Sequence, residues 1–192
     1  MNLFTNNDNK KDIYYAGIGS HNTPPEILNI MEELAYELGK RNYILRSGAS
    51  PGADFAFEKG ALKANANCEI YLPWGNFMKR EGEVYITTEE LNNYDQAKVI
   101  AKNHHYNFEE LSNKSKMLII RDTYQVLGKN LNTPSEFIIC WTPDGCITDR
   151  DRTERTGGTG QAISIASKLK IPIFNLKLKE HKKRIEEWLT KL

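Results

Sequence analysis

Apolar and polar positions along the chain predict strands and helices in alternation. Short β-branched and aromatic runs, typical of buried strands, occupy residues 12–18, 43–46, 68–72, 137–141 and 171–176. Apolar residues recur at helical spacing in residues 23–39, 53–65, 91–102, 108–131, 159–168 and 176–192. Strands that alternate with helices indicate a parallel sheet with right-handed crossovers. We therefore expect an α/β fold, with a Rossmann-like, doubly wound, mainly parallel sheet and flanking helices.

The predicted helix 23–39 has a well-marked start. Thr23 can act as its N-cap, Pro24 and Pro25 suit the first turn, and Glu26 completes a capping box.

Composition limits the chain to one domain with locally placed charge. With 192 residues and 40% hydrophobic content, we expect a single domain over residues 12–192, after a flexible polar leader at residues 1–11. The 26 basic and 25 acidic residues give a net charge of +1, so no overall field attracts nucleic acid or an anionic membrane. No window approaches the roughly 20 apolar residues of a membrane span. We expect no membrane partner, and any anion site must be local.

The cysteines favour a reducing compartment. Cys68, Cys140 and Cys146 are odd in number and lack metal-ligand spacing, and the first two lie in or beside predicted strands. We expect a cytoplasmic protein without a metal site or cofactor.

Three glycine-bearing loops follow predicted strands, where an open α/β sheet binds its ligands. The first contains Gly17, Gly19 and Ser20 before a capped helix, although a plain tight turn would look the same. The second, Ser47-Gly48-Ala49-Ser50-Pro51-Gly52-Ala53-Asp54, places small residues around a strand end and is an anion cradle by geometry. The third carries Gly157, Gly158, Thr159, Gly160 and Gln161 at the start of an apolar helix. Together they predict a phosphate-binding site.

Other side chains near these loops allow two interpretations each. Asp54 is a helix N-terminal charge, an acceptor for ribose hydroxyls or a base edge, or both. The run with Arg150, Arg152 and Arg155 is a solvated, self-compensating loop or a lid whose arginines bind phosphate. Trp74 and Trp141 either cover the core or form walls of a base pocket.

Two histidines complete the set of chemically distinctive residues. We expect His104 and His105 on the surface, because no Cys or carboxylate stands at ligand spacing from them.

Two of these loops carry a family resemblance. SGASPGADFAFEKGAL, residues 47–62, resembles the SGGARGIDxxAHxGAL segment of the DNA-processing protein DprA, and GGTGQAISIASKLKIPIF resembles the second glycine motif of the same superfamily. With GIGSHNTP, the matches extend from Ala16 to Phe174, and small phage-type DprA-like proteins are the nearest in format. The superfamily also contains the LOG proteins, which cleave the N-glycosidic bond of cytokinin nucleotides. The resemblance implies a Rossmann-like fold that binds nucleotides or their derivatives.

Departures from the superfamily motifs shape the functional expectation. Arg121 stands about where LOG enzymes carry an arginine, but Ile163 or Ser164 occupies the position of their glutamate, so we assign no catalytic residue. Pro51 replaces the DprA arginine of the second loop, and with the near-neutral charge we do not expect DNA binding.

We therefore expect non-catalytic binding of a nucleotide or nucleotide-derived signal, of ADP-ribose-like or cyclic-nucleotide type. If the protein is phage-encoded, it would sequester that signal in counter-defence. Two alternatives remain: an N-glycosidase acting on nucleoside 5′-monophosphates, and DprA-like single-stranded DNA binding. The superfamily and the C-terminal helix also suggest a homo-oligomer.

Overall fold

The computed structural model describes residues 12–191. The flexible leader expected at residues 1–11 lies outside the described residues. The described chain forms one sheet of parallel strands in the order β4-β3-β2-β1-β5-β6. The strands are β1 (Ile13–Gly17), β2 (Tyr43–Ser47), β3 (Cys68–Leu72), β4 (Tyr85–Thr87), β5 (Phe137–Cys140) and β6 (Ile173–Asn175). The predicted Rossmann-like, doubly wound α/β fold is confirmed.

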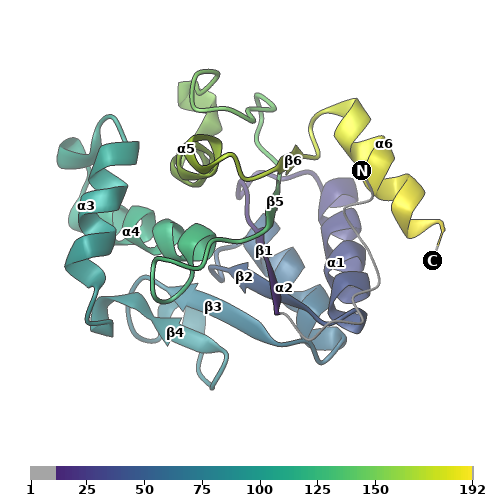
Figure 1. The fold of residues 1–192 in the computed structure, drawn as a ribbon, viewed down its shortest axis with the longest axis horizontal. Helices are drawn as coiled ribbons and strands as arrows, with labels where there is room; N and C mark the ends of the chain where they lie inside the picture. Colours follow the sequence, from purple (N-terminus) through teal and green to yellow (C-terminus); the bar gives the residue numbers. More distant parts are fainter. Residues whose placement is uncertain (1–11, 192) are drawn as a thin grey trace.

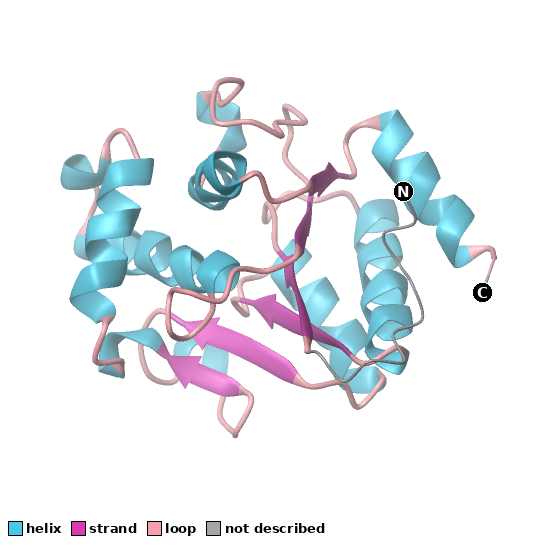
Figure 2. Cartoon of the chain, in the orientation of Figure 1, coloured by secondary structure: helices cyan, strands magenta, loops and turns pink. Residues whose placement is uncertain are grey.

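Helices cover both faces of this sheet (Figures 1 and 2). One face carries α1 (Pro25–Lys40), α2 (Ala53–Lys63) and α6 (Lys179–Leu189), and the other carries α3 (Tyr94–His104), α4 (Asn113–Leu127) and α5 (Thr159–Leu169). Successive strand residues point to opposite faces, so Tyr15 belongs to the core under α1 and α2 while Ala16 belongs to the core under α4 and α5. Central strands covered on both faces must be apolar throughout, as FIIC in β5 is.

The order of the strands creates a switch point between β1 and β5. From β1 the chain proceeds through α1 to β2 on one side, whereas β5 continues through α5 to β6 on the other. The loops after β1 and β5 therefore diverge at the carboxyl edge, where such sheets open a ligand crevice.

The start of α1 and the middle of the chain differ from the predictions. Pro24, not Thr23, is the N-cap of α1, and the predicted capping box is absent because the Thr23 hydroxyl donates instead to the Ser20 carbonyl at 2.7 Å. The edge strand β4 was not predicted. The expected helix 108–131 is a short 3-10 turn, Phe108–Glu110, followed by α4, because Ser112 caps a new helix through the Ser115 amide.

Within residues 12–191 no helix is long and apolar enough to cross a membrane. The cysteines lie as expected, with Cys68 opening β3, Cys140 ending β5 and Cys146 in the following loop.

Candidate functional site

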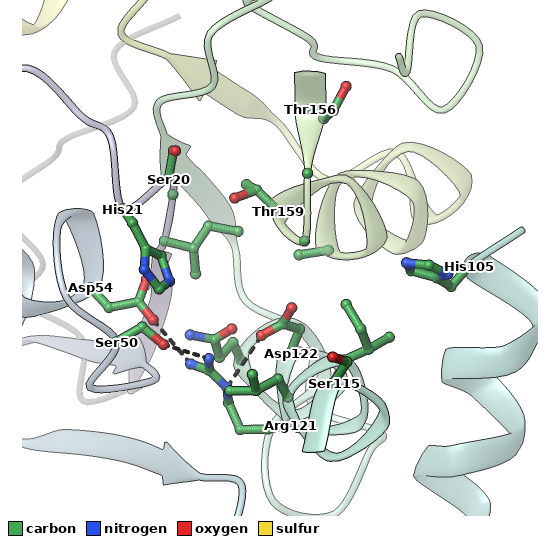
Figure 3. A pocket seen from close by; sticks show the side chains of 18 of the residues that line it. Ser20, His21, Ser50, Asp54, His105, Ser115, Arg121, Asp122, Thr156 and Thr159 are labelled. Carbon is green, nitrogen blue, oxygen red and sulfur yellow. Dashed lines mark hydrogen bonds and ion pairs between the residues drawn. The ribbon is translucent and has the colours of Figure 1, made fainter. Parts of the chain in front are cut away.

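The three glycine loops meet at one cavity because their strands are neighbours in the sheet. β2, β1 and β5 lie side by side, so the loops that leave their carboxyl ends gather at one edge. The cavity has a volume of about 330 Å³. Figure 3 shows residues of all three loops around it, with Arg121 and Asp122 below and His105 opposite. Of the predicted site residues, those that line it are Gly19, Ser20, Asp54, Arg121, Arg155, Gly157, Gly158 and Thr159.

The first loop supports the cavity mainly through its backbone. The Ser20 amide donates to the Trp141 carbonyl at 3.1 Å, which ties this loop to the end of β5. A Cβ atom on Gly19 would lie 2.8 Å from that of Ala53, so only glycine allows this approach to α2. Gly17 does not line the cavity, because Phe57 packs against it.

The second loop seats an arginine side chain rather than leaving an open cradle. A Cβ atom on Gly48 would lie 1.0 Å from Nη1 of Arg121, so the missing side chain leaves room for the guanidinium. The Ser47 hydroxyl donates to the Gly17 carbonyl at 2.7 Å and joins β2 to β1. Gly52 adopts φ +88° against the Ser20 carbonyl, and Ala49 is buried. Thus Ser47, Gly48, Ala49 and Gly52 build the floor without lining the cavity.

Arg121 is buried and held by the second loop. Its Nη1 donates to Asp54 Oδ2 at 3.0 Å and its Nη2 donates to the Ser50 hydroxyl at 2.9 Å. Burial raises the pKa of Asp54, and the adjacent guanidinium opposes that rise. Asp54 lies in the first turn of α2, as the helix-terminal interpretation expects, but its carboxylate faces Arg121. The charge of Arg121 is therefore largely compensated by partners inside the protein.

Asp122 is a second carboxyl group on the cavity, and its proton affinity is unusual. It lies 3.2 Å from Nε of Arg121. The Gln125 amide is oriented so that its nitrogen donates to Asp122 Oδ1 at 3.0 Å and its oxygen accepts from the Gly48 amide at 2.9 Å. Burial raises the pKa of Asp122 to about 7; Arg121 opposes this rise and Asp54 adds to it. Asp122 can therefore give or take a proton near neutral pH.

The third loop brings positive charge and backbone amides to the cavity. Arg155 is exposed, and Gly157, Gly158 and Thr159 lead into α5, whose first intrahelical donors come later, at Gly160 and Gln161. A helix start of this kind attracts anions.

Asp144 fixes the shape of this loop. Its Oδ2 accepts hydrogen bonds from the hydroxyls of Thr153 and Thr156, and its Oδ1 accepts from the Cys146 amide. Burial alone would raise the pKa of Asp144, but the hydrogen bonds together outweigh it and lower this pKa to about 2. Arg152 anchors the loop further, because its Nη1 donates to the His104 carbonyl at 2.7 Å.

Gly160 and Gln161 face away from the cavity. Gly160 packs near Arg152 and Thr156, while the buried Gln161 amide donates to the Thr123 hydroxyl at 2.8 Å. They fix α5 against α4.

The predicted tryptophans do not line this cavity. Trp141 is buried with Lys177 over its ring, and Trp74 packs edge-on against Phe77 at 5.0 Å between ring centroids.

Sequence reasoning missed the wall formed by the end of α3, the connection that follows it and the first turns of α4. Its residues are His105, Leu111, Ser115 and Leu118. Both histidines are half-buried rather than on the surface: His104 Nδ1 lies 2.9 Å from the Ser164 hydroxyl, and His105 reaches into the cavity (Figure 3). Only the apolar spacing of Leu111 and Leu118 before Arg121 could have indicated this wall.

No cluster of three His, Cys, Asp or Glu side chains suited to a metal occurs in the part of the chain that the structure describes. No protein-family model and no curated protein matches the chain.

Proposed function

We propose that the protein binds a nucleotide or nucleotide-derived signal in this cavity, with the phosphate at the start of α5. The observation that carries the proposal is that the cavity, at the switch point of the sheet, has one cationic end and one acidic end. Arg155 and the amides of Gly158 and Thr159 form a cationic end, whereas Asp54 and Asp122 form an acidic end. A phosphorylated sugar has this polarity, because its phosphate seeks cations and its hydroxyls donate to carboxylates.

The phosphate belongs at α5 rather than over the second loop. Arg121 is already engaged by Asp54, Asp122 and Ser50, so its charge is largely compensated and offers little attraction to an anion. Arg155 is exposed and has no carboxylate beside it among the lining residues of its end of the cavity. The acidic end is suited to sugar hydroxyls, with Ser50 and His21 available beside it.

The sequence resemblance supports the same class of ligand. DprA-like and LOG-like motifs lie in the second and third loops, both of which build the cavity. On this basis the ligand belongs to the ADP-ribose-like or cyclic-nucleotide signals, and sequestering it would suit a phage counter-defence protein.

The test identifies the ligand first and then its phosphate contact. Mass spectrometry of small molecules released from the heat-denatured protein should detect a nucleotide, and thermal-shift screening should find that nucleotides raise Tm. Arg155→Ala should reduce this shift, whereas Arg150→Ala, in the same loop but outside the cavity lining, should not. Equal shifts in both variants, or no nucleotide binding at all, would contradict the proposal.

A second candidate function is N-glycosidic cleavage of a nucleoside 5′-monophosphate. The observation that favours it is Asp122, whose raised pKa of about 7 allows it to protonate a departing base near neutral pH. In that reaction water supplies the oxygen that replaces the base on the sugar carbon.

This second candidate is tested by product analysis. Incubation with nucleoside 5′-monophosphates, followed by chromatography, should release free base if the enzyme hypothesis holds, and Asp122→Asn should abolish the release. If the nucleotide stays intact over prolonged incubation, the enzyme hypothesis is wrong and only the binding function remains.

A further inference from the structure

A largely apolar wall extends from Asp122 along α4 to His105, on the side of the cavity away from Asp54 (Figure 3). Leu111 and Leu118 are half-buried apolar side chains, with Ser115 between them and His105 above. Neither a phosphate nor a sugar hydroxyl gains from contact with leucine side chains. A flat, largely apolar group with a few polar edges does gain from such contact.

His105 adds a polar atom that is not satisfied within the protein. In the described residues, its Nδ1 is buried and has no hydrogen-bond partner. Burial and the nearby Arg152 charge lower the pKa of His105, so the neutral ring predominates near pH 7. A neutral imidazole can pack against an aromatic ring and exchange one hydrogen bond with its edge. Figure 3 shows this side chain directed from the end of α3 toward the cavity.

We propose that His105, Leu111, Ser115 and Leu118 form the subsite for the heteroaromatic base of the ligand and thereby determine base specificity. The inference rests on the proposed function, because the phosphate at α5 and the sugar at the acidic end leave this wall for the base. The base contacts the two leucines, and His105 and Ser115 meet its polar edge. Trp74 and Trp141, which the sequence suggested for this role, lie outside the lining.

The volume of the cavity agrees with one nucleoside unit. About 330 Å³ stands at the lower end of the range of small-molecule sites. A ligand with a second nucleoside unit would extend beyond the cavity, so only one base is recognised here.

The test compares ligands with and without a base. Calorimetry measures Kd for the four common nucleoside 5′-monophosphates, ADP-ribose and ribose 5-phosphate, which lacks the base. We compare the affinity for the tightest-binding nucleotide with the affinity for ribose 5-phosphate. His105→Ala should lower this ratio of affinities by about tenfold, the effect of losing one side chain that contacts the base. Binding of ribose 5-phosphate itself should stay within about twofold, since the phosphate and sugar contacts remain.

Two further variants keep the test decisive. His104→Ala is the matched control, because His104 is the neighbouring histidine but does not line this cavity. Leu118→Ser replaces an apolar part of the wall and should lower the same ratio even if His105→Ala does not fold.

The possible failures are distinguishable. If nucleotide and ribose 5-phosphate bind but neither wall variant changes their ratio, or if His104→Ala changes it equally, the base subsite is wrong and the proposed function stands. If none of these nucleotides and sugar phosphates binds the wild-type protein, the proposed base subsite is wrong. The mass spectrometry of released ligands then tests the proposed function separately.

Discussion

Arg121 carries a charge that is almost completely removed from water and is shared by two carboxyl groups. Its ion pair with Asp54 joins residues 67 positions apart, and Gly48 provides the space in which the guanidinium lies. Removing Asp54 leaves the buried guanidinium with Asp122 as its remaining carboxyl partner and takes away a hydrogen bond to a charged group. At the scale of single residues, this pair is therefore a structural support of the cavity as well as part of its wall.

Asp54→Ala should therefore destabilise the fold strongly. We expect the free energy of unfolding, measured by urea denaturation, to fall by about 1.5–3 kcal/mol, the range for losing a hydrogen bond to a charged group. The control is Glu32→Ala, which removes the surface ion pair of Glu32 with Lys59 at 2.8 Å and should cost less than about 1 kcal/mol. Similar losses for both variants would mean that the buried pair contributes no more than a surface pair.

The raised pKa of Asp122 predicts that the free energy of unfolding falls with rising pH, whereas a carboxylate whose pKa is lowered by folding gives a rise. Its pKa is about 7 in the folded protein and near 4 when unfolded, so between these values the folded state holds the extra proton. Stability from this group is present below pH 4 and is lost as the pH rises toward 7, by at most about 1.4 kcal/mol per pH unit. Asp122→Asn should remove that slope in urea denaturation measured from pH 4 to 7. An unchanged slope would assign it to another group.

At the scale of elements, the loop between β5 and α5 is held in place by hydrogen bonds between its own residues. Asp144 accepts from Thr153 and Thr156 and so orients the turn that carries Arg155 and the start of α5. The charged run is largely exposed and Arg152 pairs with Asp149 at 3.0 Å, as a solvated, self-compensating loop would be, but the loop is also anchored at Asp144 and at Arg152.

Asp144→Ala should loosen this loop without unfolding the sheet. We expect faster amide hydrogen exchange at residues 153–160 and a loss of roughly 1–3 kcal/mol in unfolding free energy, because the threonine hydroxyls lose their acceptor. The pKa of Asp144 is about 2, so its contribution is present above pH 4 and lost as the pH falls toward 2. Arg150→Ala, in the same loop but outside the hydrogen bonds of Asp144, serves as the control. Unchanged exchange in the Asp144 variant would contradict the anchoring role.

The elements could be predicted from the sequence where the pattern was local. The sequence predicts the strand of FIIC because burial on both faces makes its apolar pattern continuous, and it predicts CEIYL from the apolar and aromatic residues that are buried at its end. The edge strand β4 was missed, since its three residues pair on one side only and are half-buried. The capping box failed because Thr23 had a competing acceptor, the Ser20 carbonyl, that only the folded loop provides.

The candidate site could be predicted only in part for the same reason. Glycines mark a close approach of the backbone, but the sequence does not say what approaches: a helix at Gly19, a guanidinium at Gly48, or the cavity at Gly157. The wall with His105 and Leu118 depends on how α3 and α4 pack, and the spacing of Leu111 and Leu118 does not tell which cavity these side chains line.

At the scale of the whole molecule, charge is balanced and the cationic end of the cavity is local. The net charge is +1, and within the described chain basic side chains are repeatedly paired with acids, as in Arg46 with Glu69 and Arg80 with Glu58. A protein that tracks a nucleic-acid backbone needs a continuous basic groove instead. Nucleotide recognition at one cavity needs only Arg155 and the start of α5.

This balance predicts how the protein responds to salt and to single-stranded DNA. Binding of a mononucleotide should involve about one cation, so the slope of log Kd against log salt should be near one or below, and Arg155→Ala should flatten it. An oligonucleotide of about 20 residues should bind no more tightly than the mononucleotide, because no further phosphates are neutralised. Fluorescence anisotropy from 50 to 300 mM salt measures both. A steep slope with tight oligonucleotide binding would instead favour the DprA-like function, and would place the binding surface outside the cavity.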